Sequence, residues 1–149
     1  GICLTHGHDD HAEGIEQILA VHDAPVYLGP EDVELLGWKP SADRLKVPVP
    51  GASIAVGGRF VHCLATPGHT PGGICYRIDD PATPLCFVGD TLFAGSIGRS
   101  NPFTLYPIHL TSVRATVLGL PPSYRLLPGH GPATTVDEER ARNPFFVPA

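Results

Sequence analysis

The sequence predicts a mixed α/β fold, because segments with the apolar spacing of helices alternate with segments that have the composition of strands. Apolar residues recur at helical spacing over 12–22, whereas 60–65 and 85–88 are short apolar runs bounded by turn residues. Of the 149 residues, 42% are hydrophobic, and a chain of this length can bury one core. No repeat, charge block or linker divides the chain, so a single domain is predicted over 1–149.

The first part of the chain predicts short elements around one helix. Residues 2–4 have the composition of a strand end, 12–22 form the helix, and 25–28 form a second strand. Pro30 is followed by two acidic residues, a combination that favours the first turn of a short helix. The prolines within 37–51 predict a loop.

The remainder of the chain predicts mainly strands, followed by helices. The sequence Asp-Asp-Pro at 79–81 predicts a turn between two strands, and 90–106 lacks a regular spacing and is predicted to be an irregular loop. The predicted strands lie at about 53–56, 60–65, 73–78, 85–88 and 124–127, and the predicted helices at about 108–119 and 137–142.

Charge and hydropathy exclude two classes of partner. The formal net charge of −5 argues against a nucleic-acid-binding surface. No apolar run approaches the roughly 20 residues that a membrane span needs, and no secretory signal pattern is present. We therefore expect no nucleic acid and no membrane as partners, and the sequence leaves the oligomeric state open.

Two further features concern the origin and compartment of the chain. It contains no methionine, and the apolar residues 2–4 run directly into a His/Asp cluster, which predicts a chain that is incomplete at its N-terminus.

The four cysteines Cys3, Cys63, Cys75 and Cys86 lie in apolar surroundings and no two have C-x-x-C spacing. They are predicted to be buried thiols in a reducing compartment, which favours a cytoplasmic location.

The densest polar segment directly follows the first predicted strand. Residues 5–11 have the sequence THGHDDH, which contains the pattern H-x-H-x-D-H. In a tight loop between strand and helix, His6 and His8 can point one way while Asp10 and His11 reach a second point nearby. Imidazole and carboxylate groups are ligands that suit zinc, iron, nickel or manganese.

Three more candidate ligands, His69, Asp90 and His130, follow predicted strands, each next to glycine. Glycine allows close backbone approach, so a ligand can be aimed from a loop on a rigid sheet. Each short motif alone could be an ordinary turn. His62 is predicted to pack on its strand face, and His109 to begin a helix without metal-like neighbours. The whole constellation predicts a two-metal site, because burying so many unpaired polar groups would cost several kcal/mol.

These residues resemble the metallo-β-lactamase superfamily, and within it the glyoxalase II-like (hydroxyacylglutathione hydrolase-like) hydrolases. The matching motifs are THGHDDH at 5–11, TPGHTPGG at 66–73, FVGDTLFAGSIGRS at 87–100, LPGHGP at 127–132 and EERARNPF at 138–145. The resemblance implies an αββα four-layer sandwich of two mixed sheets with helices outside. It also implies that the N-terminal part of the first sheet is missing from this chain.

The resemblance also implies a ligand set and its metals. The first ion would be held by His6, His8 and His69, the second by Asp10, His11 and His130, and Asp90 would bridge the two. Two divalent ions per chain are expected, with Zn2+ favoured and Fe or Mn also suited to these ligands. The bridging Asp90 distinguishes the chain from true metallo-β-lactamases, so the superfamily name does not define the activity.

The implied activity is that of a thioesterase that uses a metal-bridging hydroxide. Two metals about 3.5–4 Å apart lower the pKa of a shared water and polarise the substrate carbonyl. Asp10 could also orient the hydroxide and pass on its proton, and Arg99 could hold a substrate carboxylate. No nucleophilic serine in a G-x-S-x-G setting is present.

Departures from the family pattern leave alternatives open. Ser100-Asn101 replaces the usual Thr-Asp, Pro102-Phe103-Thr104 replaces a common Gly-Gly stretch, and no C-terminal glutathione-binding helical domain is expected. A second possibility is a related lactone or phosphodiester hydrolase, or a mononuclear-iron persulfide dioxygenase. A third is a metal-binding remnant without activity, which would expose an apolar face and an unpaired strand edge.

Overall fold

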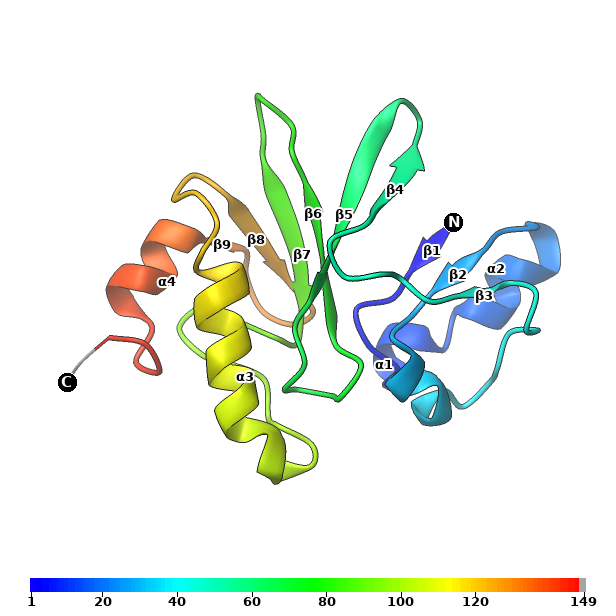
Figure 1. The fold of residues 1–149 in the computed structure, drawn as a ribbon, viewed down its shortest axis with the longest axis horizontal. Helices are drawn as coiled ribbons and strands as arrows, with labels where there is room; N and C mark the ends of the chain where they lie inside the picture. Colours follow the sequence, from blue (N-terminus) through cyan, green and yellow to red (C-terminus); the bar gives the residue numbers. More distant parts are fainter. Residues whose placement is uncertain (148–149) are drawn as a thin grey trace.

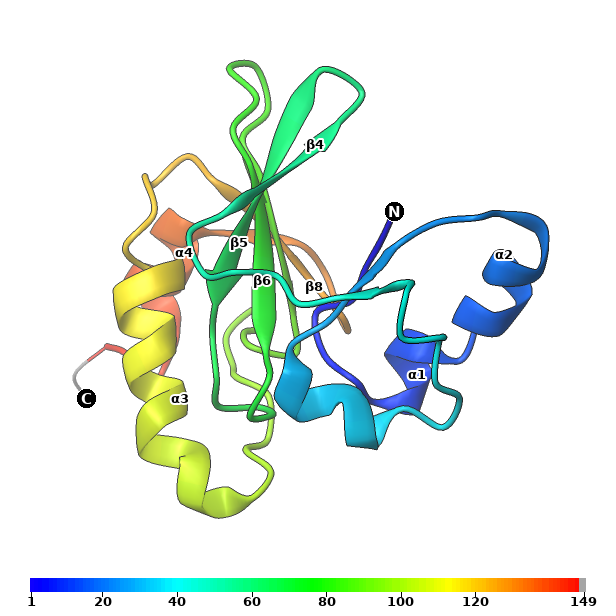
Figure 2. The ribbon, with the colours of Figure 1, turned by 45° about the vertical axis from the view of Figure 1, so that its right-hand side comes forward.

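In the computed structural model, which describes residues 1–147, two β-sheets face each other and helices cover their outer sides (Figure 1). The smaller sheet has the strand order β1-β2-β3, and the larger has the order β4-β5-β6-β7-β8-β9. Helices α3 and α4 lie beside the larger sheet, and α1 and α2 lie beyond the smaller one, as Figure 2 shows from a second direction. The predicted αββα sandwich is confirmed.

The elements have the following bounds. The strands are β1 (Ile2–Cys3), β2 (Val26–Tyr27), β3 (Leu45–Lys46), β4 (Ser53–Val56), β5 (Arg59–Ala65), β6 (Ile74–Ile78), β7 (Leu85–Gly89), β8 (Arg125–Pro128) and β9 (Thr134–Thr135). The α-helices are α1 (Asp9–Ala12), α2 (Ile15–Val21), α3 (Tyr106–Ser112) and α4 (Val136–Arg142). Pro30–Leu35 and Phe103–Leu105 are 3-10 helices, and Val113–Val117 continues α3 as a π-helical turn.

The two sheets differ in strand direction. All pairings in the smaller sheet are parallel. In the larger sheet β4 to β7 are antiparallel neighbours, β7 and β8 are parallel, and β8 and β9 are antiparallel. The parallel pair places the ends of β7 and β8 at the same edge of the sheet, and this edge carries candidate ligands.

Several predicted boundaries were wrong. The predicted helix over 12–22 is two helices that begin at Asp9 and break around Gly14, and the acidic residues of the first turn favour the earlier start. The helix predicted over 108–119 begins earlier, at Tyr106. Strands β3, inside the predicted loop, and β9 have two residues each, too few for a periodicity to be visible.

Each sheet has its own apolar core. The larger sheet packs on α3 and α4 through a cluster of buried residues, among them Cys75, Cys86, Val88, Val113, Val117, Leu126 and Val136. The smaller sheet packs on α2 and the first 3-10 helix through Leu4, Ile15, Leu19, Val26, Leu28 and Leu36. The two halves of the chain, before and after the connection into β4, are therefore each stabilised mainly by their own helices.

An apolar groove of about 440 Å³ lies between the two sheets. Its lining includes Val61 and Leu127 from the larger sheet and Leu4 from β1 and its continuation. Phe87 and Val56 also line it, and they remain 43% and 50% exposed. Part of the inner side of the larger sheet is thus an exposed apolar surface.

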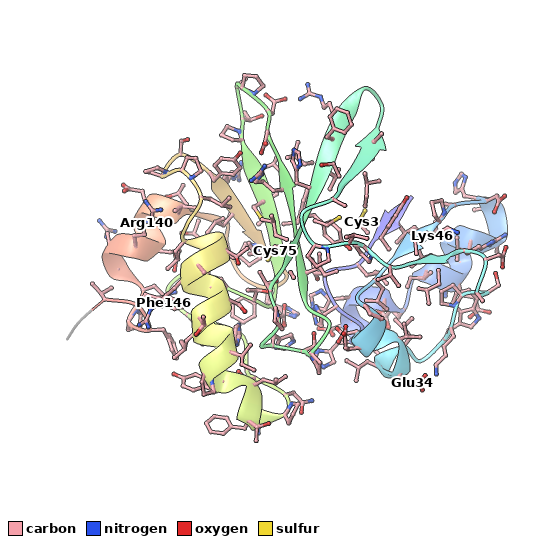
Figure 3. All side chains as sticks on the ribbon, in the orientation of Figure 1. Cys3, Glu34, Lys46, Cys75, Arg140 and Phe146 are labelled. Atoms are coloured by element: carbon pink, nitrogen blue, oxygen red, sulfur yellow. The ribbon has the colours of Figure 1, made fainter. Side chains whose placement is uncertain are left out.

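The cysteines follow the prediction at three of four positions. Cys63, Cys75 and Cys86 are buried, and all four thiols are free. Cys3 is exposed, so its predicted burial was wrong: it lies on β1 at the edge of the smaller sheet and lines the groove. Figure 3 shows Cys3 beside the larger sheet and Cys75 near the centre of the molecule. Within residues 1–147, no helix has the length and apolar character needed to cross a membrane.

Truncating the main core should destabilise the fold. Leu126 on β8 is fully buried in the core of the larger sheet. We expect Leu126→Ala to lower the free energy of unfolding by about 2–5 kcal/mol, because it removes buried contacts and leaves a cavity. Denaturant titration followed by circular dichroism measures this change. The control Ile108→Ala, at a side chain 47% exposed on α3, should change it by less than about 1 kcal/mol. Equal effects of the two variants would contradict this assignment of the core.

Candidate metal centre

The predicted ligands come together in space. The segments that carry them lie at one edge of the sandwich, where strands from both sheets end (Figure 1). His6, His8, Asp10 and His11 lie in the segment that connects β1 to α1 and in α1 itself. His69 lies in the loop after β5, Asp90 directly follows β7, and His130 follows β8. The structure thus brings all seven predicted ligands together, from segments up to 119 residues apart.

The first cluster contains His6, His8 and His69, whose ligand atoms lie within 4.8 Å of one another. Nε2 of His69 is 3.0 Å from Nδ1 of His8. Nδ1 of His69 donates a hydrogen bond of 2.7 Å to the carbonyl oxygen of Arg99, because a carbonyl oxygen can only accept. This bond fixes the tautomer and leaves the Nε2 lone pair of His69 facing the cluster.

The second cluster contains Asp10, His11 and His130 and is more exposed than the first. Nε2 of His130 is 3.1 Å from Oδ2 of Asp10 and 3.3 Å from Nε2 of His11. Nε2 of His11 is 3.6 Å from the same Asp10 oxygen. The side chains of Asp10 and His130 are 59% and 57% exposed, so solvent reaches this cluster directly.

Asp90 lies between the two clusters. Its Oδ1 is 3.3 Å from Nε2 of His11, which belongs to the second cluster. Its Oδ2 is 3.7 Å from Nε2 of His69 in the first cluster and 3.6 Å from Nε2 of His130 in the second. One carboxylate therefore faces both groups of imidazoles, with its side chain only 12% exposed.

Two atoms of this centre are buried without a hydrogen-bond partner among residues 1–147: Nε2 of His6 and Oδ1 of Asp90. Such atoms cost free energy unless something compensates the lost water. Both carry a lone pair and face other lone-pair donors, so a cation is the group that satisfies them together. Imidazole nitrogens with carboxylate oxygens are a donor set that fits zinc, iron or manganese.

Burial keeps two of the imidazoles neutral. Burial, together with the neighbouring imidazoles, lowers the pKa of His6 to about 2. Burial also lowers the pKa of His69, against the opposing effects of the Arg99 carbonyl and of Asp90. Neutral imidazole is the form that coordinates a metal, so both side chains are prepared for binding at neutral pH.

Three residues discussed in the sequence occupy other surroundings. The side chain of Arg99 is exposed and forms no ion pair or hydrogen bond with the described residues, although its carbonyl oxygen holds His69. His109 is outside the ligand set, as predicted, but is buried in α3 against the Asp90 loop, with Nε2 donating to the carbonyl oxygen of Thr91. His62 does not simply pack: Ser53 Oγ is 2.7 Å from its Nδ1.

Sequence reasoning missed one buried residue at the centre. Asp32, expected only as an acidic residue in the first turn of a short helix, is fully buried and bonded to two of the loops that carry ligands. Its partners Gly7, Thr70 and Gly72 are 25 to 40 residues away in the chain. No local sequence pattern predicts contacts between residues this far apart in the chain.

A four-layer sandwich with a His/Asp centre at its strand ends defines a class of metal-dependent hydrolases. The family model described as the Metallo-beta-lactamase superfamily matches residues 1–130, and the chain belongs to this superfamily. It is accordingly a metallo-hydrolase with possible metal-binding residues at the site described above.

Three relatives illustrate the likeness. The chain is 34% identical to the "Probable metallo-hydrolase YqgX" of Bacillus subtilis, over 97% of this chain and 74% of that protein. It is 40% identical to a "Hydroxyacylglutathione hydrolase" of Pseudomonas putida, over 66% of this chain and 35% of that protein. The crystal structure of "TTHA1623 in a di-iron-bound form" superposes with a TM-score of 0.83 and 32% identity, over 97% of this chain and 76% of that chain.

Glycine at position 129 is required by the packing of two ligands. A methyl group there would overlap Oδ1 of Asp90 and Cε1 of His11. We expect Gly129→Ala to displace both side chains and to weaken metal binding by roughly 10- to 100-fold, as when the contacts that orient ligands are lost. Elemental analysis of the purified protein measures the bound metal. The control Gly14→Ala adds its methyl group where no atom lies within 4 Å and should keep the full metal content. Full metal content in Gly129→Ala would refute the predicted overlap.

Proposed function

We propose that this chain is a binuclear metal-dependent thioesterase of the hydroxyacylglutathione hydrolase (glyoxalase II-like) type. The observation that carries the proposal is the position of Asp90, whose carboxylate lies within 3.7 Å of His69 in the first cluster and of His11 and His130 in the second. In this proposal His6, His8 and His69 would hold one ion and Asp10, His11 and His130 would hold the other, with Asp90 as a ligand available to both. The ions are two divalent cations per chain, with Zn2+ favoured and Fe or Mn as alternatives.

When bound, the two ions would supply an acidified water and a positive charge for the oxygen of the substrate carbonyl. Residues of the chain orient the ligands and the water. The exposed carboxylate of Asp10 accepts the proton of the attacking water and holds it for the leaving thiolate. The Arg99 carbonyl oxygen keeps His69 in the tautomer that presents Nε2.

The proposed substrate is a small thioester that carries a carboxylate. Arg99 lies beside the first cluster, because its carbonyl oxygen accepts a hydrogen bond from His69. Its guanidinium group is therefore available to pair with a carboxylate of a bound thioester. The net charge of −5 favours a small molecule over a nucleic acid, and we expect no membrane partner. The four free thiols support a reducing, cytoplasmic compartment.

The proposal is favoured over a mononuclear-iron dioxygenase by the second cluster. A single ion at His6, His8 and His69 would leave Asp10, His11 and His130 without a role, although their ligand atoms lie within 4.8 Å of one another. The relative named as a hydroxyacylglutathione hydrolase adds support for a thioester substrate. Lactone and phosphodiester hydrolysis use the same metal chemistry and form the comparison panel for assays.

Removing the charge of Asp90 tests the two-metal proposal. We expect Asp90→Asn to bind fewer than two metals per chain, because one oxygen donor between the clusters is lost. Hydrolysis of a hydroxyacylglutathione thioester should fall on the order of 10²–10³-fold, the loss typical when one group that stabilises transition-state charge is removed. Thiol release and elemental analysis measure the two effects. The control Asp137→Asn, at an exposed position in the first turn of α4, should retain both. One iron per wild-type chain with oxygen consumption would contradict the proposal.

Arg99 is tested separately because it concerns affinity for the substrate. Arg99→Ala should raise KM for a carboxylate-bearing thioester by about 10-fold, the loss of roughly one charge-assisted hydrogen bond, and leave kcat within about 3-fold. Arg99→Lys should restore part of the affinity, since it keeps the charge but not the planar fork. Steady-state kinetics measure both constants, with the exposed Arg142→Ala as the control. Unchanged KM in Arg99→Ala would remove this residue from the substrate site.

A further inference from the structure

A buried carboxylate outside the ligand set joins two loops that carry the first cluster. Asp32, in the 3-10 helix Pro30–Leu35, is fully buried, and no cationic side chain of residues 1–147 pairs with it. Its Oδ2 accepts hydrogen bonds from the amide of Gly7 at 3.1 Å and from Oγ1 of Thr70 at 2.7 Å. Its Oδ1 accepts from the amide of Gly72 at 2.7 Å.

Two of these three donors lie directly beside ligands of the first cluster. Gly7 lies between His6 and His8, and Thr70 directly follows His69, so the bonds of Asp32 reach both chain segments that form the first cluster. No hydrogen bond of Asp32 goes to the segment around His130 or to Asp10 and His11 of the second cluster. The donors that lie directly beside ligands are therefore next to residues of the first cluster only.

Close packing supports the same connection. A methyl group at Gly7 would overlap the main-chain oxygen of Asp32, and one at Gly72 would lie 2.8 Å from its Oδ1. Both loops thus approach the 3-10 helix at glycine positions, where the carboxylate can bond directly to the backbone. Since a buried carboxylate is tolerated only when hydrogen-bonded, the three donors must stay in place around it, and the loops with them.

We propose that Asp32 is a positioning residue for the first cluster: by holding the β1–α1 segment against the loop after β5, it sets how tightly His6, His8 and His69 bind a metal ion. It does not touch the ion. The inference rests on the part of the proposed function that assigns a metal to this cluster, and it does not depend on thioester hydrolysis.

The chain offers a matched control at Glu139. This carboxylate on α4 is 4% exposed and accepts hydrogen bonds from the amide of Gly95 at 3.0 Å, from Oγ1 of Thr134 at 2.7 Å and from Nδ2 of Asn143 at 2.7 Å. It thus has nearly the same kinds of partners as Asp32, and none of them is adjacent to a candidate ligand. A general effect of removing a buried carboxylate should appear in both variants.

The experiment is a calorimetric titration of the metal-free full-length chain with Zn2+ alone. His8→Ala and His130→Ala first identify which binding step belongs to which cluster. We expect Asp32→Asn to weaken the step of the first cluster by roughly 10- to 100-fold and to leave the other within about 3-fold. Thr70→Val, which removes one of the three donors, should weaken the same step to a smaller extent, and it serves as the test if Asp32→Asn does not fold. Glu139→Gln should lower the thermal midpoint of unfolding and leave both steps unchanged.

The outcomes separate this inference from the proposed function. The positioning role would be overturned if Asp32→Asn weakened both binding steps equally or weakened neither. It would also be overturned if Glu139→Gln selectively weakened one binding step. If the wild-type chain binds two Zn2+ ions and Asp32→Asn shows the selective loss but no thioester is hydrolysed, the thioesterase proposal fails and the role of Asp32 stands. A wild-type chain that binds no Zn2+ would overturn both.

Discussion

The candidate metal centre depends on the hydrogen bonds that join the two sheets where their strands end. The amide of Ile74, at the start of β6, donates to the carbonyl oxygen of Thr5 at 2.8 Å, and Tyr76 donates from its hydroxyl group to the carbonyl oxygen of Leu4 at 2.9 Å. His6 follows directly. Because each sheet has a separate apolar core, these few polar contacts and the contacts of Asp32 set how the ligands of the two halves meet.

That arrangement places the ligands at a point where the protein alone leaves polar atoms unsatisfied. His6 Nε2 and Asp90 Oδ1 are buried without partners, and burial holds His6 and His69 neutral by lowering their pKa. Such groups destabilise a metal-free chain, since no hydrogen bond from the described residues compensates them. A bound cation would reverse this cost, so metal binding and stability of this edge are coupled. Functional sites commonly contain such buried polar groups without partners.

The two clusters differ in their surroundings, and the difference suits different tasks. The first is largely buried, with His8 partly exposed, and is braced by the Arg99 carbonyl oxygen and by the loops that Asp32 holds. The second includes the exposed side chains of Asp10 and His130. A rigid, dry group of ligands favours a firmly held ion, and an open group admits water and substrate.

The sequence by itself determined the mixed α/β class and the candidate ligands, because short apolar runs, glycine-flanked strand ends and H-x-H-x-D-H are local patterns. The αββα arrangement was implied by the resemblance of its motifs to a known superfamily. The tertiary structure alone decided that Asp32 braces the first cluster and that Cys3 is exposed, and it places Asp90 between the two clusters, as the resemblance implied. The bonds of Asp32 span 25 to 40 residues, and the exposure of Cys3 depends on which strand forms the sheet edge. Contacts of that range leave no periodicity or spacing in the chain, since they depend on how two separately packed halves come together.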